Sequence, residues 1–134
     1  MQPLSMALEV MEDGHVARVR LYGDNGFDVS LENADAISAF VSARQFRALI
    51  IDWNDCEMLQ DVQQFRGVAD HFIATLPPAT IFIVLHRPAQ LSHAMFLTQA
   101  LHRAGFPARA FQSEIECLAW LASNKLLPTP EDTN

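Results

Sequence analysis

Arg-Ala-Leu-Ile-Ile-Asp-Trp-Asn-Asp-Cys-Glu-Met, residues 47–58, is the stretch that decides the fold. Its apolar part, residues 48–51, is short and unbroken, which is typical of a strand buried on both faces of a sheet. The acidic residues that follow, 52–57, are predicted to form the exit loop of this strand and the start of the next helix. Open α/β sheets place their binding sites at this carboxyl end. The stretch therefore predicts a central strand with a candidate site at its exit.

Four further segments carry strand signals. Residues 7–11 and 15–23 alternate apolar and polar side chains on either side of an Asp-Gly turn, which predicts an antiparallel hairpin. Residues 80–85 form a second unbroken run of strand-favouring residues, and residues 109–111 form a short last strand. Because strands and helices alternate after the hairpin, the sheet should be mostly parallel there and mixed as a whole.

Two helices are predicted on either side of the central strand. The first follows a polar loop at residues 24–31, is capped by Asn33 and ends near Gln45. The second carries apolar side chains at three- and four-residue steps from Val62 to Leu76, which is one face of an amphipathic helix. The proline pair that follows Leu76 stops it.

Two more helices complete the order β-β-α-β-α-β-α-β-α. The third, from Leu91 to Ala104, is expected to bury Met95 and to leave Phe96 off its apolar stripe. The fourth begins at a capping box formed by Ser113 with Glu116. Its inward side chains are expected to be Ile115, Leu118, Leu121 and Ala122.

Length and charge narrow the function classes. The chain has 134 residues, which predicts one domain at residues 1–127, and residues 128–134 are expected to be a disordered tail. A net charge of −7 with a single lysine argues against nucleic acid or an anionic membrane as the partner. Neither a signal peptide nor a membrane span is recognisable, and the two cysteines match no metal or redox spacing. We therefore expect a cytoplasmic protein with no cofactor and no bound metal.

The element order resembles that of the STAS domain, the fold of sulphate-transporter tails and anti-sigma-factor antagonists, and is most similar to small stand-alone SpoIIAA-like proteins. The strands at residues 48–52 and 80–85 carry the resemblance, together with the ending Ala-Phe-Gln-Ser-Glu-Ile-Glu-Cys-Leu-Ala-Trp-Leu at residues 110–121. The resemblance implies a regulatory module that binds proteins. It also implies a phosphorylatable Ser or Thr after the central strand, at the start of the next helix. Residues 53–74 contain neither, so the kinase switch should be absent.

Four acids, Asp52, Asp55, Glu57 and Asp61, crowd the predicted exit loop and helix start. They are open to three interpretations: fixed charge that imitates a phosphorylated residue, ligands for a hard cation together with Asp24, or solvated acids favoured by the helix dipole.

Two enzymatic interpretations are weaker. Cys56 could be a nucleophile with His86 as its base, although an idle buried thiol needs no further assumption. The Leu-Ile-Ile-Asp run also resembles that of a response-regulator receiver, but the acidic pair and the lysine that a receiver requires are missing.

Apolar side chains near the strand ends exceed what one helix face needs, and they could form a ligand pocket, a dimer surface or core. We expect a non-enzymatic module that binds a protein partner or itself, most simply as a homodimer, with a small apolar (lipid-like) ligand as the alternative. The candidate binding residues are Asp52, Trp53, Asn54, Asp55, Cys56, Glu57, Met58, His86, Met95 and Phe96.

Overall fold

The computed structural model describes residues 4–11 and 14–126. The strands are β1 (Ser5–Val10), β2 (Val16–Asn25), β3 (Ala48–Met58), β4 (Ile81–Leu85) and β5 (Ala108–Phe111). The helices are α1 (Phe27–Arg44), α2 (Val62–Thr75), α3 (Leu91–Arg103) and α4 (Glu114–Ser123), and a short 3-10 turn, Pro88–Gln90, precedes α3. The predicted order of strands and helices is confirmed. The predicted tail, residues 128–134, lies outside the described residues.

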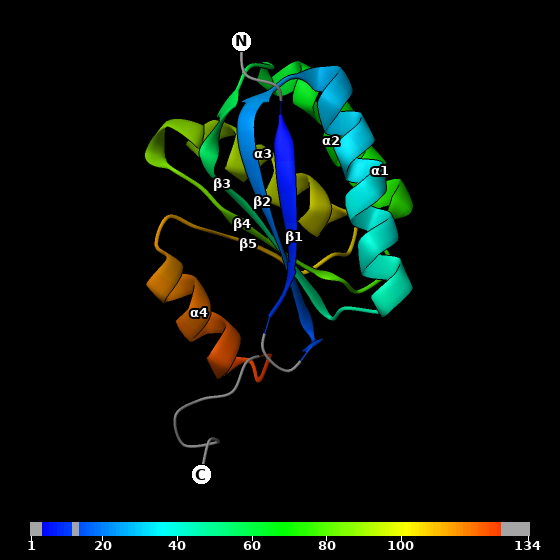
Figure 1. The fold of residues 1–134 in the computed structure, drawn as a ribbon, viewed down its shortest axis with the longest axis vertical. Helices are drawn as coiled ribbons and strands as arrows, with labels where there is room; N and C mark the ends of the chain where they lie inside the picture. The colour runs from blue at the N-terminus through cyan, green and yellow to red at the C-terminus, as the bar shows by residue number, and fades with distance from the viewer. Residues whose placement is uncertain (1–3, 12–13, 127–134) are drawn as a thin grey trace.

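All five strands form one sheet in the order β1-β2-β3-β4-β5, with β3 in the middle (Figure 1). β1 pairs with β2 in antiparallel fashion, and the other three pairings are parallel. The sheet is therefore mixed, and the central position predicted for the apolar run is correct.

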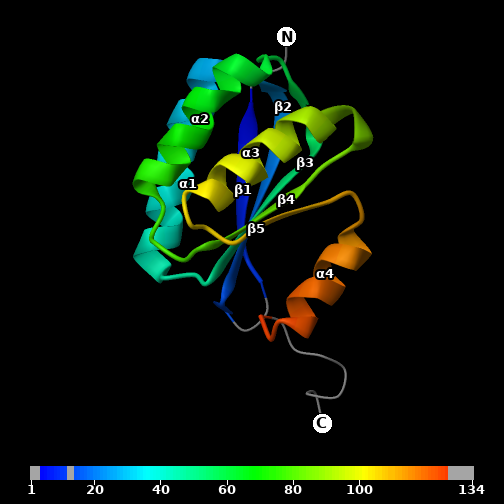
Figure 2. The ribbon, with the colours of Figure 1, turned by 180° about the vertical axis from the view of Figure 1, so that it is seen from behind.

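Helices cover the two faces of the sheet unequally. α1, α2 and α3 lie on one face and α4 lies alone on the other, near one end of the sheet (Figures 1 and 2). The larger core packs the first three helices against alternate strand residues such as Val19, Ile51 and Val84. The smaller core packs Cys117 and Leu121 of α4 against the opposite side chains. Burial on both faces explains why β3 and β4 read as unbroken apolar runs.

The start of the first helix was predicted incorrectly. α1 begins at Phe27 and not at Asn33, and Gly26 occupies the N-cap position. Phe27 and Leu31 pack against the larger core, so burial of these side chains draws the polar segment into the helix. Its other end is as predicted, because Gln45 closes the helix in a left-handed conformation.

Three apolar positions of the last two helices were also predicted incorrectly. Met95 is 43% exposed, whereas Phe96 is half-buried against the larger core. Ile115 is 81% exposed, and α4 buries only Cys117 and Leu121 fully. The physical reason is the orientation of each helix: α3 turns Ala94, Leu97 and Leu101 to the core and α4 turns Cys117 and Leu121 to the sheet, so Met95 and Ile115 fall on the sides that face away. No helix in the described ranges is long and apolar enough to cross a membrane.

Candidate functional site

β3 continues through the residues that were predicted to be its exit loop. It runs to Met58, and the whole acidic segment after Ile51 pairs with β2, whose last partner is Asn25. The prediction of a loop and helix start at residues 52–57 is therefore wrong. β2 itself extends to Asn25 and offers a row of backbone groups, so ladder hydrogen bonds outweigh the polar composition of the segment.

A β-bulge in this extension decides which side chains are buried. Arg20 pairs with Asp52 and Tyr22 pairs with Asp55, so β3 has one residue more than β2 between these pairs. The extra residue shifts the side-chain alternation. As a result Trp53 and Cys56, three residues apart, both enter the larger core, at 2% and 1% exposure.

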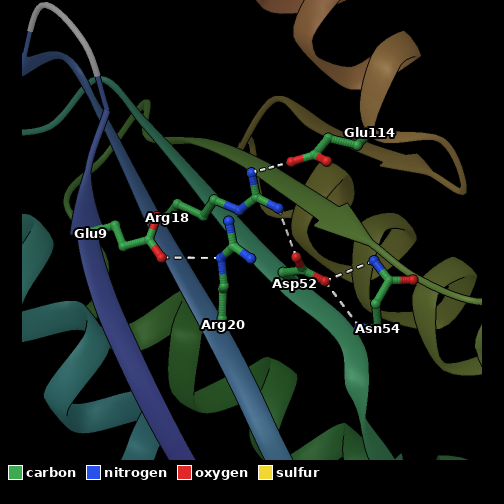
Figure 3. A network of polar contacts seen from close by, with 6 residues as sticks. All are labelled: Glu9, Arg18, Arg20, Asp52, Asn54 and Glu114. Atoms are coloured by element: carbon green, nitrogen blue, oxygen red, sulfur yellow. Dashed lines mark hydrogen bonds and ion pairs between the residues drawn. The ribbon is translucent and has the colours of Figure 1, made fainter.

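Asp52 lies on the opposite face, in a buried ion pair beneath α4 (Figure 3). Its carboxylate accepts hydrogen bonds from Arg18 Nη2 at 2.8 Å and from the backbone and side chain of Asn54 at 2.9 and 2.8 Å. Burial alone would raise the pKa of Asp52, but these hydrogen bonds outweigh burial and lower it. Arg18 also reaches Glu114 in the first turn of α4 at 2.5 Å. Burial opposes the charge of Arg18, yet both carboxylates hold its pKa above the ordinary value. Arg18 therefore ties α4 to the sheet, and Asp52 compensates its buried charge.

The remaining acids are spread along the surface. Asp55 and Glu57 are exposed on β3, and Glu57 pairs with Arg87 at 3.0 Å. Asp61 caps α2 four residues further on. In the ranges that the structure describes, no group of three or more His, Cys, Asp or Glu side chains is arranged to hold a metal ion.

Asp61 lies at the start of α2 in a complete capping box. Its carboxylate accepts from the backbone N–H of Gln64 at 2.7 Å, and the side chain of Gln64 accepts from the backbone N–H of Asp61 at 3.1 Å. Leu59, two residues earlier, is 54% exposed although it is apolar. The turn between β3 and α2 thus presents a leucine and a carboxylate two positions apart in the chain.

Buried polar contacts hold this turn in place. Gln60, 3% exposed between Leu59 and Asp61, donates to Ser30 Oγ at 2.8 Å, and its carbonyl contacts Nε2 of His93 at 2.7 Å. Gln90 donates to the carbonyls of Trp53 and Cys56 at 3.0 and 2.9 Å. The start of α3 therefore fixes both the end of β3 and the turn, which makes the presented pair preorganised.

Cys56 and His86 do not form an activated pair in this arrangement. Burial raises the pKa of the Cys56 thiol to about 12, against a smaller opposing effect of Arg87. Nδ1 of His86 contacts the carbonyl of Arg87 at 2.8 Å, and the side chain is buried. A neutral, enclosed thiol is not a nucleophile near pH 7.

The apolar candidates are not brought into one pocket. Trp53 packs edge-to-face on Phe65 at 5.6 Å, Met58 is half-buried beside Asn25, and Met95 lies on the outer side of α3. The apolar cavity that Trp53 and Phe65 line has a volume of about 20 Å³. That space holds about one water molecule and is far below the several hundred Å³ typical of ligand sites.

Comparison with known proteins gives matches at the level of structure. No family model and no curated protein matches the chain. An anti-sigma factor antagonist from Mycobacterium paratuberculosis aligns with a TM-score of 0.64 and 21% identity over 88% of this chain and 93% of that one. The antagonist SpoIIAA in its unphosphorylated form aligns with a TM-score of 0.50 and 18% identity, over 87% and 97%. An uncharacterized protein from Shewanella loihica with a SpoIIAA-like fold aligns at 0.53 and 10%, over 90% and 95%.

The chain has the SpoIIAA-like fold. The resemblance to STAS domains is thereby confirmed at the level of the fold. Within the SpoIIAA-like fold, the start of the helix after the central strand is the position where the resemblance implies a phosphorylatable hydroxyl. Here that helix start is Asp61, followed by Val62.

Sequence reasoning missed four residues of this site: Leu59, Gln60, Gln90 and His93. Leu59 was overlooked because an isolated leucine between two polar segments carries no periodic signal. Gln90 and His93 belong to the start of α3, more than 30 residues away in the chain, and only the folded structure brings them to the turn. Asp61 was predicted, but as one member of an acidic cluster and not as the helix cap.

Proposed function

We propose that this SpoIIAA-like protein is a non-enzymatic regulatory module that binds a protein partner at the turn between β3 and α2 and has no phosphorylation switch there. One observation carries the proposal: a fixed carboxylate, Asp61, occupies the helix start where the resemblance implies a switchable hydroxyl. A carboxylate supplies permanent negative charge and accepts no phosphate from a Ser/Thr kinase.

The preorganised turn supports a binding role. A leucine that is 54% exposed, two residues before a fixed carboxylate, combines an apolar contact with a charge that sets orientation. Gln60, His93 and Gln90 hold the turn, so little conformational entropy is lost when a partner docks.

Charge indicates the chemistry of the partner. Asp55 and Glu57, both exposed, lie on the β3 segment that leads to this turn, and the whole chain carries a net charge of −7. Long-range attraction favours a basic partner surface and disfavours nucleic acid. The two buried free cysteines suit the reducing cytoplasm, where we propose that the protein acts.

Site-specific photo-cross-linking tests the proposal directly. A photoreactive amino acid at position 59, in the source cells, should trap one discrete partner. The same amino acid at Ala36, exposed on the outer side of α1, serves as the control. Equal patterns of cross-linked bands from positions 59 and 36 would contradict the proposed surface.

A charge-only variant then tests the role of Asp61 against the trapped partner. Asp61→Asn keeps an N-cap residue and removes the charge, and calorimetry should show binding weakened by about ten-fold, as expected for a lost charge-assisted contact. Asp70→Asn, on the exposed side of the same helix, should bind like the wild type. Unchanged affinity in Asp61→Asn would remove the argument from fixed charge.

Self-association is the second arrangement that the sequence predicts. Native mass spectrometry of the purified chain counts its subunits and detects any retained small molecule in the same spectrum. A homodimer that Leu59→Glu dissociates would make a second copy the partner at this turn. A monomer at all concentrations would leave a different protein as the partner.

A further inference from the structure

β5 is an edge strand whose outer backbone groups have no partner within the described chain. The carbonyls of Pro107 and Phe111 accept from Phe82 and His86 of the β4 side at 2.8 and 2.9 Å. Successive residues of a strand point their backbone groups in alternate directions. The N–H and C=O groups of Ala108 and Ala110 therefore point away from β4, toward the open edge.

Two shallow hollows flank this edge, one at each alanine. The first, about 230 Å³, lies at Ala108 and is lined by His102 and Arg103 of α3. The second, about 480 Å³, lies at Ala110 and is lined by Leu91 and Met95 of α3 and by polar groups of His86, Gln112, Ser113 and Glu116. Leu91 and Met95 are 46% and 43% exposed. The small alanine side chains leave room between the edge of the sheet and α3.

Two arginines lie along this edge of a negatively charged chain, with one acid, Glu116, in the second hollow. Arg103 borders the first hollow, and Arg109 lies next to Ala108, with its guanidinium 5.7 and 5.5 Å from the ring centres of Phe111 and Trp120. Neither arginine has an ion-pair partner in the described ranges. A chain with a net charge of −7 thus presents two unpaired cations at one strand edge.

We propose that the β5 edge is a second binding surface, which takes an extended acidic peptide segment of a partner protein as an added strand. The outward backbone groups of Ala108 and Ala110 would pair with the peptide, and side chains two residues apart in the peptide would enter the two hollows. Such side chains are roughly 6.6–6.8 Å apart along a strand, the same spacing as Ala108 and Ala110. The peptide carries an Asp or Glu opposite Arg103 and an apolar residue against Leu91 and Met95.

Selection from a random decapeptide phage library against the full chain tests this surface. The enriched sequences should pair an acid with an apolar residue two positions away. In nuclear magnetic resonance titrations with one synthetic enriched peptide, the largest amide shifts should fall on β5 and the outer side of α3. Shifts centred on the start of α2, or no enriched sequence at all, would overturn the proposal and leave the function proposed for the Leu59–Asp61 turn untouched.

Two edge variants and one control variant measure how much the β5 edge contributes to peptide binding. Ala110→Pro removes an outward N–H at an edge position that tolerates proline, and it should weaken the synthetic peptide by roughly ten-fold or more. Arg103→Glu should weaken it comparably, whereas Arg66→Glu, exposed on α2, should not change it. Affinity within two-fold of the wild type in both edge variants would refute the surface. If the wild-type chain forms a homodimer and Ala110→Pro dissociates it, the edge binds a second copy of the chain. That result would overturn the proposal of an acidic peptide partner.

Discussion

Replacing Asp52 by Asn should lower the free energy of unfolding far more than the replacement of an exposed acid would. Arg18 is 5% exposed and has two carboxylate partners, of which Asp52 is buried and Glu114 is half exposed. Breaking a buried ion pair costs about 3–5 kcal/mol, because an uncompensated charge remains. Glu114 still compensates part of that charge, so we expect Asp52→Asn to lose about 3 kcal/mol.

Urea unfolding followed by tryptophan fluorescence measures this loss, since Trp53 is buried in the larger core. The control is Arg20→Met, which removes an ion pair with Glu9 at 3.0 Å between half-exposed side chains. An exposed pair of that kind contributes about 0–1 kcal/mol. The double variant Arg18→Met with Asp52→Leu should recover most of the loss, because apolar side chains of similar volume can replace a buried pair.

The pH dependence of stability gives the same prediction a second readout. The folded state lowers the pKa of Asp52 below the ordinary aspartate value of 3.8, so in acid the unfolded chain binds the extra proton. The stabilisation is therefore complete above about pH 5 and declines as the pH falls through the lowered pKa. The difference between wild type and Asp52→Asn should stay constant from about pH 5 to 8 and shrink below about pH 4. A loss under about 1 kcal/mol at neutral pH, or a difference that does not shrink in acid, would refute the buried-pair argument.

Three further results are expected. Cys56 of the folded protein should react only slowly with a thiol reagent even at pH 9, because burial raises the pKa of its thiol to about 12. A reactivity midpoint at the ordinary thiol value of about 8.5 would restore the nucleophile interpretation. Gly67→Ala should lower the melting temperature, because its new methyl group would lie 2.9 Å from the ring of Phe27. Overpacking of this kind costs about 1–3 kcal/mol. Calorimetry that shows an unchanged melting temperature would mean that the Phe27 ring moves aside freely. Leu121→Ala should lower the free energy of unfolding by about 2–5 kcal/mol and Ile115→Ala by less than about 0.5 kcal/mol, since the two side chains are 0% and 81% exposed. Equal unfolding midpoints of the two variants would contradict the packing of α4.

The order of elements could be predicted because it depends on local patterns that burial reinforces. The unbroken run at residues 48–51 reads correctly as the central strand, since both of its faces are covered. The end of that strand could not be predicted in the same way. Whether residues 52–58 form a loop or a strand depends on how far β2 extends beside them, and β2 lies more than 30 residues earlier in the chain.

The candidate site illustrates the same limit. Acidic residues near the helix start were predicted, but alternation and a bulge divide them between a buried pair at Asp52, an exposed strand face and the cap at Asp61. A helical stripe likewise indicates which side chains share a side of a helix, but only the packing of the whole helix decides which of two neighbouring stripes turns inward. Met95 and Ile115 are exposed for that reason.

The two proposed surfaces meet at the first turns of α3. Gln90 and His93 face the end of β3 and hold the turn that carries Leu59, while Leu91 and Met95 face the β5 edge. Suppose that α3 can occupy two alternative placements against the sheet. A peptide at β5 can influence the β3–α2 turn only if it binds these two placements with different affinity. If α3 stays in place when the peptide binds, the two proposed surfaces would act independently of each other. The carboxylate at the start of α2 is fixed and cannot act as a switch. A shift of α3 is therefore the structural change through which one partner could affect the binding of the other.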